Sequence, residues 1–192
     1  MHIVETRVGG EPCRGYFAES VEDLAAFGRW VADHADERVA VDSETTGLNP
    51  YARDFRVRMV QFGTAREGWL IPAEWGPQFM GAIREALGTL RRLVIHNYSF
   101  DALAFDAVGL ARLEDIARRV VDTRILAHLY DSRPQEEGGV GTFLKALAVA
   151  YVDPEADDGQ RALTRVFNSL GHTRETGWAH IDVRHPDYLR YA

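Results

Sequence analysis

Apolar residues recur along this chain with two different spacings, which predict strands and helices in alternation. Short apolar runs bounded by turn residues are typical of strands, and apolar residues three or four positions apart are typical of helices. Strands are expected at 38–44, 57–62, 68–72, 93–96 and 119–121, after a hairpin within 2–19 that turns at Gly9-Gly10. Helices are expected at 20–34, 77–90, 100–110, 123–129, 142–151, 154–170 and 185–192. This order predicts an α/β domain built on a mixed sheet of about five strands flanked by helices.

Capping residues indicate where several of these helices begin. Ser20 with an acid three positions later is a variant of the capping box, Asp122 or Thr123 is expected to cap a later helix, and Thr142 the next one. Two other stretches lack a clear period. The acidic, glycine-rich stretch 134–139 predicts a loop, and the polar stretch 171–184 predicts an exposed, mobile segment.

Length and composition are those of one globular domain. The chain has 192 residues, of which 46% are hydrophobic and 27% charged, enough for one substantial core. It contains no apolar run near the ~20 residues that cross a bilayer. Its N-terminus also lacks the basic and then apolar pattern of a secretory signal. We therefore expect a cytoplasmic protein without a membrane partner.

The net charge weighs only moderately against a nucleic-acid partner. The formal charge is −7 at pH 7, whereas proteins that bind phosphate backbones usually carry a basic patch. An enzyme that acts on phosphodiesters through metal ions needs a cluster of carboxylates, and the cations make that cluster attractive to phosphate. Charge alone therefore leaves nucleic acid open as a substrate.

The first segment with candidate chemistry is the strand end at 39–48, which contains Asp42 and Glu44. Side chains alternate along a strand, so these two carboxylates lie on the same face. Carboxylates placed in this way can converge on a pair of divalent cations. An isolated acid-x-acid pattern at a strand end is more often merely solvated, so the interpretation depends on the rest of the chain.

The second segment is 93–101, in which a buried strand is followed by Asn97 and by Asp101 in the first turn of a helix. An acid at that position is also explained by the helix dipole alone. Neither segment is specific by itself, and the combination of the two carries the argument.

Together, D-x-E-T-T-G-L at 42–48 and H-N-x-x-F-D at 96–101 resemble the motifs of the DEDD superfamily of 3′→5′ exonucleases. With the run V-R-M-V-Q-F-G at 57–63, the chain is similar in particular to the proofreading domain of family A DNA polymerases, the DNA polymerase I type, and especially to bacteriophage versions. The resemblance covers 39 to about 151 and returns at Tyr191. It implies an RNase H-like fold and a DNA 3′ end as the substrate.

The resemblance also implies roles for individual residues. Asp42, Glu44 and Asp101 correspond to metal ligands for two divalent ions, and ligands that are all oxygens favour Mg²⁺ or Mn²⁺. Thr45 corresponds to a residue that contacts the terminal nucleotide. Leu48 corresponds to a wedge between the last two bases, although it could instead pack in the core.

Three further positions have two interpretations each. Asn97 corresponds to a residue that helps to position the substrate, and it could also cap the following helix. Tyr98 could stack on an unpaired base or be a partly buried aromatic residue. Asp122-Thr123 resembles the start of the family's next helix, where capping is the favoured role and any contribution to the site is indirect.

The third family motif, Y-x-x-x-D, begins in this chain at Tyr191, which would help to orient the attacking water. Its aspartate would fall beyond Ala192. We therefore expect 1–192 to be a single exonuclease domain from the N-terminal part of a longer polymerase, cut just before the end of this motif. The alternative is a natural short protein with an incomplete site. The expected partners are a single-stranded DNA 3′ end and a covalently attached polymerase domain.

Two other functions remain open on the same residues. One is a 3′→5′ exoribonuclease of the RNase D type, which shares the first two motifs and the tyrosine of the third. The other is a catalytically silent exonuclease-like domain that only binds DNA or supports a neighbouring domain.

Overall fold

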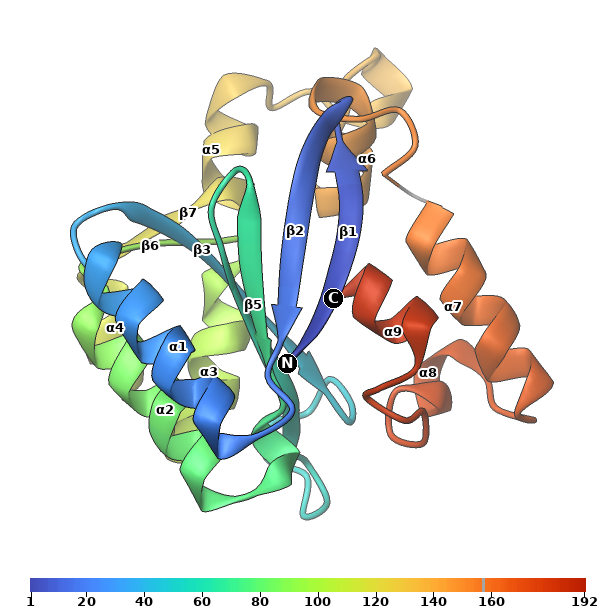
Figure 1. Cartoon of the computed structure of the whole chain (residues 1–192). Coiled ribbons are helices and arrows are strands. Elements are labelled where there is room, and N and C mark those ends of the chain that lie inside the picture. The colour runs from blue at the N-terminus through green and yellow to red at the C-terminus, as the bar shows by residue number, and fades with distance from the viewer. Residues whose placement is uncertain (157) are drawn as a thin grey trace.

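The computed structural model describes residues 1–156 and 158–192, without the side chain at position 158. Its centre is a single mixed sheet with the strand order β1-β2-β5-β4-β3-β6-β7 (Figure 1). The strands are β1 (His2–Val8), β2 (Glu11–Phe17), β3 (Arg38–Thr45), β4 (Val57–Gly63), β5 (Glu67–Ile71), β6 (Arg92–Ile95) and β7 (Val120–Asp122). Within the described residues no helix has the length and apolar character needed to span a membrane.

The expectation of about five strands was too low, because both strands of the predicted hairpin join the sheet at one edge. The predicted hairpin does form, turning at Gly9 and Gly10 with positive φ, and β2 joins the sheet by pairing parallel to β5. At the other edge β7 pairs parallel to β6 through only three residues. Between these edges β3, β4 and β5 form an antiparallel meander.

Four helices cover one face of the sheet: α1 (Val21–Asp33), α2 (Pro77–Thr89), α3 (Tyr98–Ala107) and α4 (Leu113–Ala117). Side chains from these helices pack with Val39 and Val41 of β3 in the main hydrophobic core. α1 begins after Ser20 as predicted, and the backbone N–H of Ser20 donates to Asp23 Oδ2. Because Val39 and Val41 point into this core, the alternate residues of β3 face the other side of the sheet.

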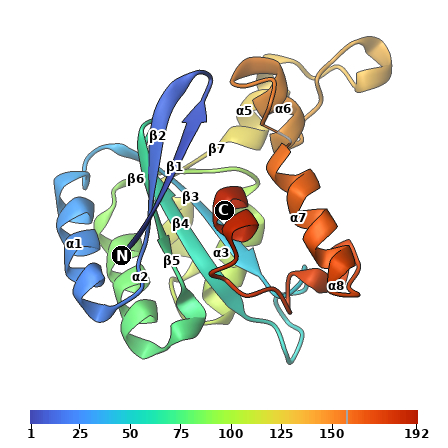
Figure 2. The ribbon, with the colours of Figure 1, turned by 45° about the vertical axis from the view of Figure 1, so that its right-hand side comes forward.

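The second face is covered only in part, by α7 (Asp158–Ser169) and α9 (Pro186–Tyr191), which lie on the other side of the sheet from α1 and α2 (Figure 2). Phe17, Met59 and Leu70 of the sheet form a smaller core with these helices. α5 (Thr123–Tyr130) and α6 (Leu144–Tyr151) follow β7, and α6 lies near the tip of the hairpin.

The prediction of an exposed segment at 171–184 is confirmed only in part, because most of its residues are exposed but three are buried. This segment contains the short helix α8 (Arg174–Gly177), and both Ile181 and Val183 are buried in the smaller core. Its few apolar residues are too widely spaced to show a period, so the pattern did not reveal their burial. Arg58, which is 5% exposed on β4, donates to the carbonyl oxygens of Trp178 and Ile181 and holds the segment against the sheet.

Smaller differences concern helix ends. Thr142 does not cap α6, which begins at Leu144 with Phe143 at the N-cap position. The helix expected at 154–170 begins at 158, after turn residues at 154–156, and position 157 lies outside the described residues. The loop at 134–139 includes one 3₁₀ turn, Gln135–Glu137.

Candidate active site

β3 places Asp42 and Glu44 on the incompletely covered face of the sheet, because side chains two positions apart on a strand point to the same face. Asp42 pairs in register with Gln61 of β4, and Gln61 Nε2 donates to Glu44 Oε1 over 3.3 Å. A β-bulge between Glu44 and Thr45 ends the regular pairing at this point. Bulges redirect the following side chains, so the turn after Thr45 leaves the sheet beside the two carboxylates.

Asp101 approaches the same strand from α3. It is 3% exposed, and its Oδ1 accepts a hydrogen bond of 2.6 Å from Ser43 Oγ, between Asp42 and Glu44 in sequence. β6 runs parallel to β3, so α3, which begins directly after β6, starts beside the carboxyl end of β3. The two predicted motifs are therefore neighbours in space.

The three carboxyl groups affect one another electrostatically. Burial, followed by the charge of Asp42, raises the pKa of Glu44 to about 8. Burial and then Asp42 also raise the pKa of Asp101 to about 7. Asp42 keeps access to solvent but lies in a recess, where desolvation raises the pKa of its carboxyl as well. Like charges at a buried site repel unless a cation or a proton offsets them.

The chemistry of this donor set fits a hard divalent cation, because every donor is a carboxylate oxygen. Within the described residues, no three His, Cys, Asp or Glu side chains are already arranged to hold an ion.

Asp122 fixes the start of α3 and caps α5, as predicted. Its carboxylate accepts hydrogen bonds from the backbone N–H groups of Asn97 (3.0 Å) and Tyr98 (3.1 Å), and from that of Arg124 (2.8 Å). Asn97 occupies the N-cap position of α3 with φ of 62°, a left-handed conformation that asparagine tolerates. Its side chain makes no capping bond and accepts instead from Arg124.

The predicted substrate contacts lie around the end of β3. Thr45 is 8% exposed and its Oγ1 donates to the Gly47 carbonyl, which shapes the turn. Leu48 is 87% exposed, so the alternative that it packs in the core is wrong. Tyr98 is half-buried against the main core.

Tyr191 reaches the site from α9. Its ring packs against Trp178 with centroids 5.2 Å apart. Burial, together with the charges of Glu44 and Asp42, raises the pKa of its hydroxyl well above the usual value, so the tyrosine is protonated and lies near both carboxylates. It also lines the cavity of about 480 Å³ that contains Asp42.

Three residues near the carboxylates were not predicted as part of the site. Gln61 lies in the run 57–63 and pairs with Asp42 across the meander, and only the pairing of β3 with β4 brings it to the site. His96 lines the cavity beside Asp42, and both of its ring nitrogens are hydrogen-bonded, to Thr123 Oγ1 and the Thr142 carbonyl. Lys145 of α6 lies 4.3 Å from the centre of the Tyr191 ring, and no sequence pattern indicated it.

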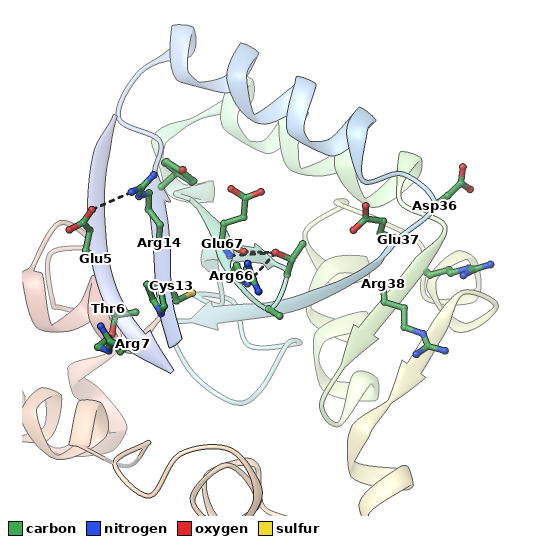
Figure 3. Close-up of a pocket in the computed structure, with 15 residues that line it drawn as sticks. Glu5, Thr6, Arg7, Cys13, Arg14, Asp36, Glu37, Arg38, Arg66 and Glu67 are labelled. Atoms are coloured by element: carbon green, nitrogen blue, oxygen red, sulfur yellow. Dashed lines mark hydrogen bonds and ion pairs between the residues drawn. The ribbon is translucent and has the colours of Figure 1, made fainter. Parts of the chain in front are cut away.

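A larger cleft, of about 1260 Å³, lies near the beginning of β3 and contains none of the predicted site residues. Figure 3 shows its charged lining, including the Glu5–Arg14 ion pair of 3.5 Å at one wall and Arg38 and Glu37 at another. The size of a cavity therefore does not identify the candidate active site.

Solved structures share this fold. An RNase D from Trypanosoma brucei, in complex with GMP, matches with a TM-score of 0.62 and 16% identity over 92% of this chain and 52% of that one. The exonuclease domain of Nibbler from Aedes aegypti matches with a TM-score of 0.55 and 16% identity over 92% of this chain and 79% of that one. The architecture is thus the RNase H-like exonuclease fold, as the motifs implied.

Sequence comparison identifies the family. The chain is 39% identical over 91% of its length to a DNA polymerase of Mycobacterium phage L5, and 37% identical over 91% to one of Mycobacterium phage D29. It spans 29% of the length of each of these relatives. A family model described as 3′-5′ exonuclease matches residues 18–167. The chain therefore belongs to the 3′-5′ exonuclease family.

Proposed function

We propose that this chain is the proofreading domain of a phage DNA polymerase and removes the 3′-terminal nucleotide of a single-stranded or frayed DNA end. The observation that carries the proposal is the coupling of the three carboxyl groups of Asp42, Glu44 and Asp101, two of which are buried, beside Tyr191. In the folded protein these acids destabilise one another, which is hard to explain for a purely structural role. The polymerase relatives support DNA as the substrate.

Asp42, Glu44 and Asp101 would hold the divalent ions, Mg²⁺ or Mn²⁺. When bound, such ions supply an activated water and stabilise the charge on the leaving 3′ oxygen. Ser43 and Gln61 orient two of the carboxyl groups through the hydrogen bonds at Asp101 and Glu44. The protonated Tyr191 hydroxyl can donate a hydrogen bond toward the attacking water or the phosphate.

Thr45 and Leu48 support a role at the end of the substrate strand. Thr45 is held in the turn beside Glu44, and Leu48 projects from the same turn without packing partners in the core. An exposed leucine in that position is suited to insert between the last two bases. A mismatched end needs less energy to unpair, so such a site would act preferentially on errors. Asn97 and Tyr98, at the first turn of α3, complete the proposed substrate contacts.

The test is hydrolysis of a labelled single-stranded DNA by a longer chain in the native reading frame, in Mg²⁺. Asp42→Ala and Asp101→Ala should abolish the activity while circular dichroism shows an intact fold. Asp106→Ala is a matched control, because Asp106 is an exposed acid on the same helix as Asp101. Retention of more than about a tenth of the rate in the first two variants would refute the assignment, since metal activation is worth several kcal/mol.

Matched DNA and RNA oligonucleotides decide the substrate class. Faster hydrolysis of DNA is expected, and faster hydrolysis of RNA would favour an RNase D-like exoribonuclease. Binding of DNA without hydrolysis, by the longer chain with all its carboxylates, would favour a silent domain. If the proposal holds, the domain acts in the cytoplasm of a phage host, covalently attached to a polymerase domain.

A further inference from the structure

A second groove, of about 700 Å³, lies between the hairpin tip, α6, α7 and α9. Figure 2 shows these elements on the incompletely covered side of the sheet, with the hairpin tip near α6 and with α9 between the sheet and α7. Five basic side chains line the groove: Arg7, Lys145, Arg161, Arg165 and Arg190. Asp153 and Glu155 are the acidic residues among its described lining.

The charge of this groove is opposite to that of the molecule. The whole chain has 29 acidic and 22 basic residues, whereas basic residues clearly exceed acidic ones here. Asp153 already accepts hydrogen bonds from the backbone N–H groups of Gly9 and Glu155, each 2.9 Å long. These hydrogen bonds partly offset the negative charge of Asp153. The groove therefore has a net positive field that attracts anions.

The walls of the groove are held at fixed separations by close packing. Gly9 has φ of +57°, and a Cβ there would lie 2.9 Å from the Val152 carbonyl oxygen, so the hairpin tip fits closely on the loop after α6. On the other side, a Cβ on Gly159 of α7 would lie 3.7 Å from Tyr191 Cα. On α7, Arg161 and Arg165 are four residues apart and therefore share one side of the helix.

Tyr191 connects this groove to the carboxylates, because it lines both the groove and the cavity beside Asp42. Lys145 also lines the groove, and its ammonium group lies 4.3 Å from the ring centre of Tyr191. Leu48, in the turn after β3, lines neither space. A ligand in the groove therefore adjoins the site without touching Leu48.

We propose that this groove binds nucleotide phosphate groups next to Tyr191, through Arg165, Arg190 and the neighbouring basic side chains. The inference rests on the proposed nuclease function, since it assigns the phosphates to the substrate strand or to the nucleoside monophosphate that leaves. Both sources present the same chemistry, a phosphate dianion or diester that arginine binds with paired N–H donors.

The test uses the 192-residue chain and measures binding, so it does not depend on hydrolysis. The double variant Arg165→Ala/Arg190→Ala is compared with Arg29→Ala/Arg118→Ala, which removes the same charge from exposed positions on α1 and at the end of α4. Fluorescence anisotropy with a labelled oligothymidylate, in EDTA, gives Kd at several salt concentrations. Calorimetry with thymidine 5′-monophosphate gives the affinity for the mononucleotide.

In the groove variant, Kd for the oligonucleotide should rise roughly 10-fold, and the slope of log Kd against log salt should fall by about 0.7 for each phosphate that the variant no longer binds. Weaker binding of the monophosphate alone would assign the groove to the product. Unchanged affinity for both ligands, or an equal loss in the control variant, would overturn the proposal. Failure of the nuclease assignment is seen separately, in the hydrolysis assay with Asp42→Ala.

Discussion

Glu44→Gln replaces a buried, ionisable carboxyl group with a neutral amide while keeping the size and shape of the side chain. Glu44 is 7% exposed, and burial together with the charge of Asp42 raises the pKa of its carboxyl from 4.5 to about 8. In the unfolded chain the same group ionises near its usual pKa. Between these two values the folded protein keeps a proton that the unfolded chain has released, so the free energy of unfolding falls as pH rises.

The size of the effect follows from that difference in pKa. One pKa unit corresponds to ~1.36 kcal/mol, so at pH 7 the metal-free protein loses roughly 3 kcal/mol relative to its stability at low pH. The amide introduced by Glu44→Gln does not ionise in this pH range, so this position no longer makes the free energy of unfolding depend on pH. The new amide oxygen can still accept from Gln61 Nε2, and its N–H can reach toward Gln61 Oε1, which has no partner among the described residues.

Urea unfolding followed by tryptophan fluorescence, at pH 5 to 8 in EDTA, measures the difference. Glu44→Gln should be more stable than the native chain by about 1–3 kcal/mol at pH 7 to 8, and the gap should close toward pH 5. In millimolar Mn²⁺ the order should reverse, because the native chain gains a bound cation and the variant has lost a ligand. Glu85→Gln, an exposed position on α2, is the control.

A variant that is no more stable than the native chain at pH 8, with the same dependence on pH, would refute this reasoning. It would mean that the Glu44 carboxylate is solvated or already compensated in the metal-free fold. A melting temperature unmoved by Mn²⁺ in the native chain would count against the metal site itself.

Three further changes test other parts of the structure. Arg58→Met should lower the free energy of unfolding by about 3 kcal/mol, because it leaves Glu74 and two carbonyl oxygens without their partner; unchanged urea unfolding would show that 178–181 docks without it. Leu48→Ala in the longer chain should slow cleavage of duplex ends more than of single strands, and equal losses on matched oligonucleotides would argue against a wedge. Extending the chain by about a dozen residues of its reading frame should raise hydrolysis of a labelled strand by on the order of 100-fold, and equal rates would mean that the third motif is misplaced.

The first two motifs could be located from the sequence because their chemistry is local. Asp42 and Glu44 share a strand, whose alternation fixes a common face, and Asp101 follows directly after another buried strand. The pattern could not show that Ser43 would bond to Asp101, since that hydrogen bond joins residues 58 positions apart. The same limit applies to Gln61, where pairing of β3 with β4 decides which residue lies beside Asp42.

The segment before α9 shows a different limit. Periodicity detects a buried face only when several apolar residues repeat along one element, whereas 171–184 is mostly exposed and is anchored by isolated buried residues such as Ile181 and Val183. Arg58 contributes to the same docking through two carbonyl oxygens, an interaction that depends on backbone position and leaves no trace in residue types. Placement of Tyr191 therefore follows from packing that the local sequence does not encode.

The net charge of −7 was uninformative because it averages two fields of opposite sign. Acids are concentrated at the end of β3 and the start of α3, and arginines line the groove between α7, α9 and the hairpin tip. Tyr191 lies between them, in contact with Lys145 and within reach of the charges on Asp42 and Glu44. A DNA strand is attracted to the groove at any metal concentration, but to the carboxylates only when cations are bound. Binding without metal and hydrolysis with metal should therefore respond to different substitutions, and this separation distinguishes the proposed arrangement from a single acidic site.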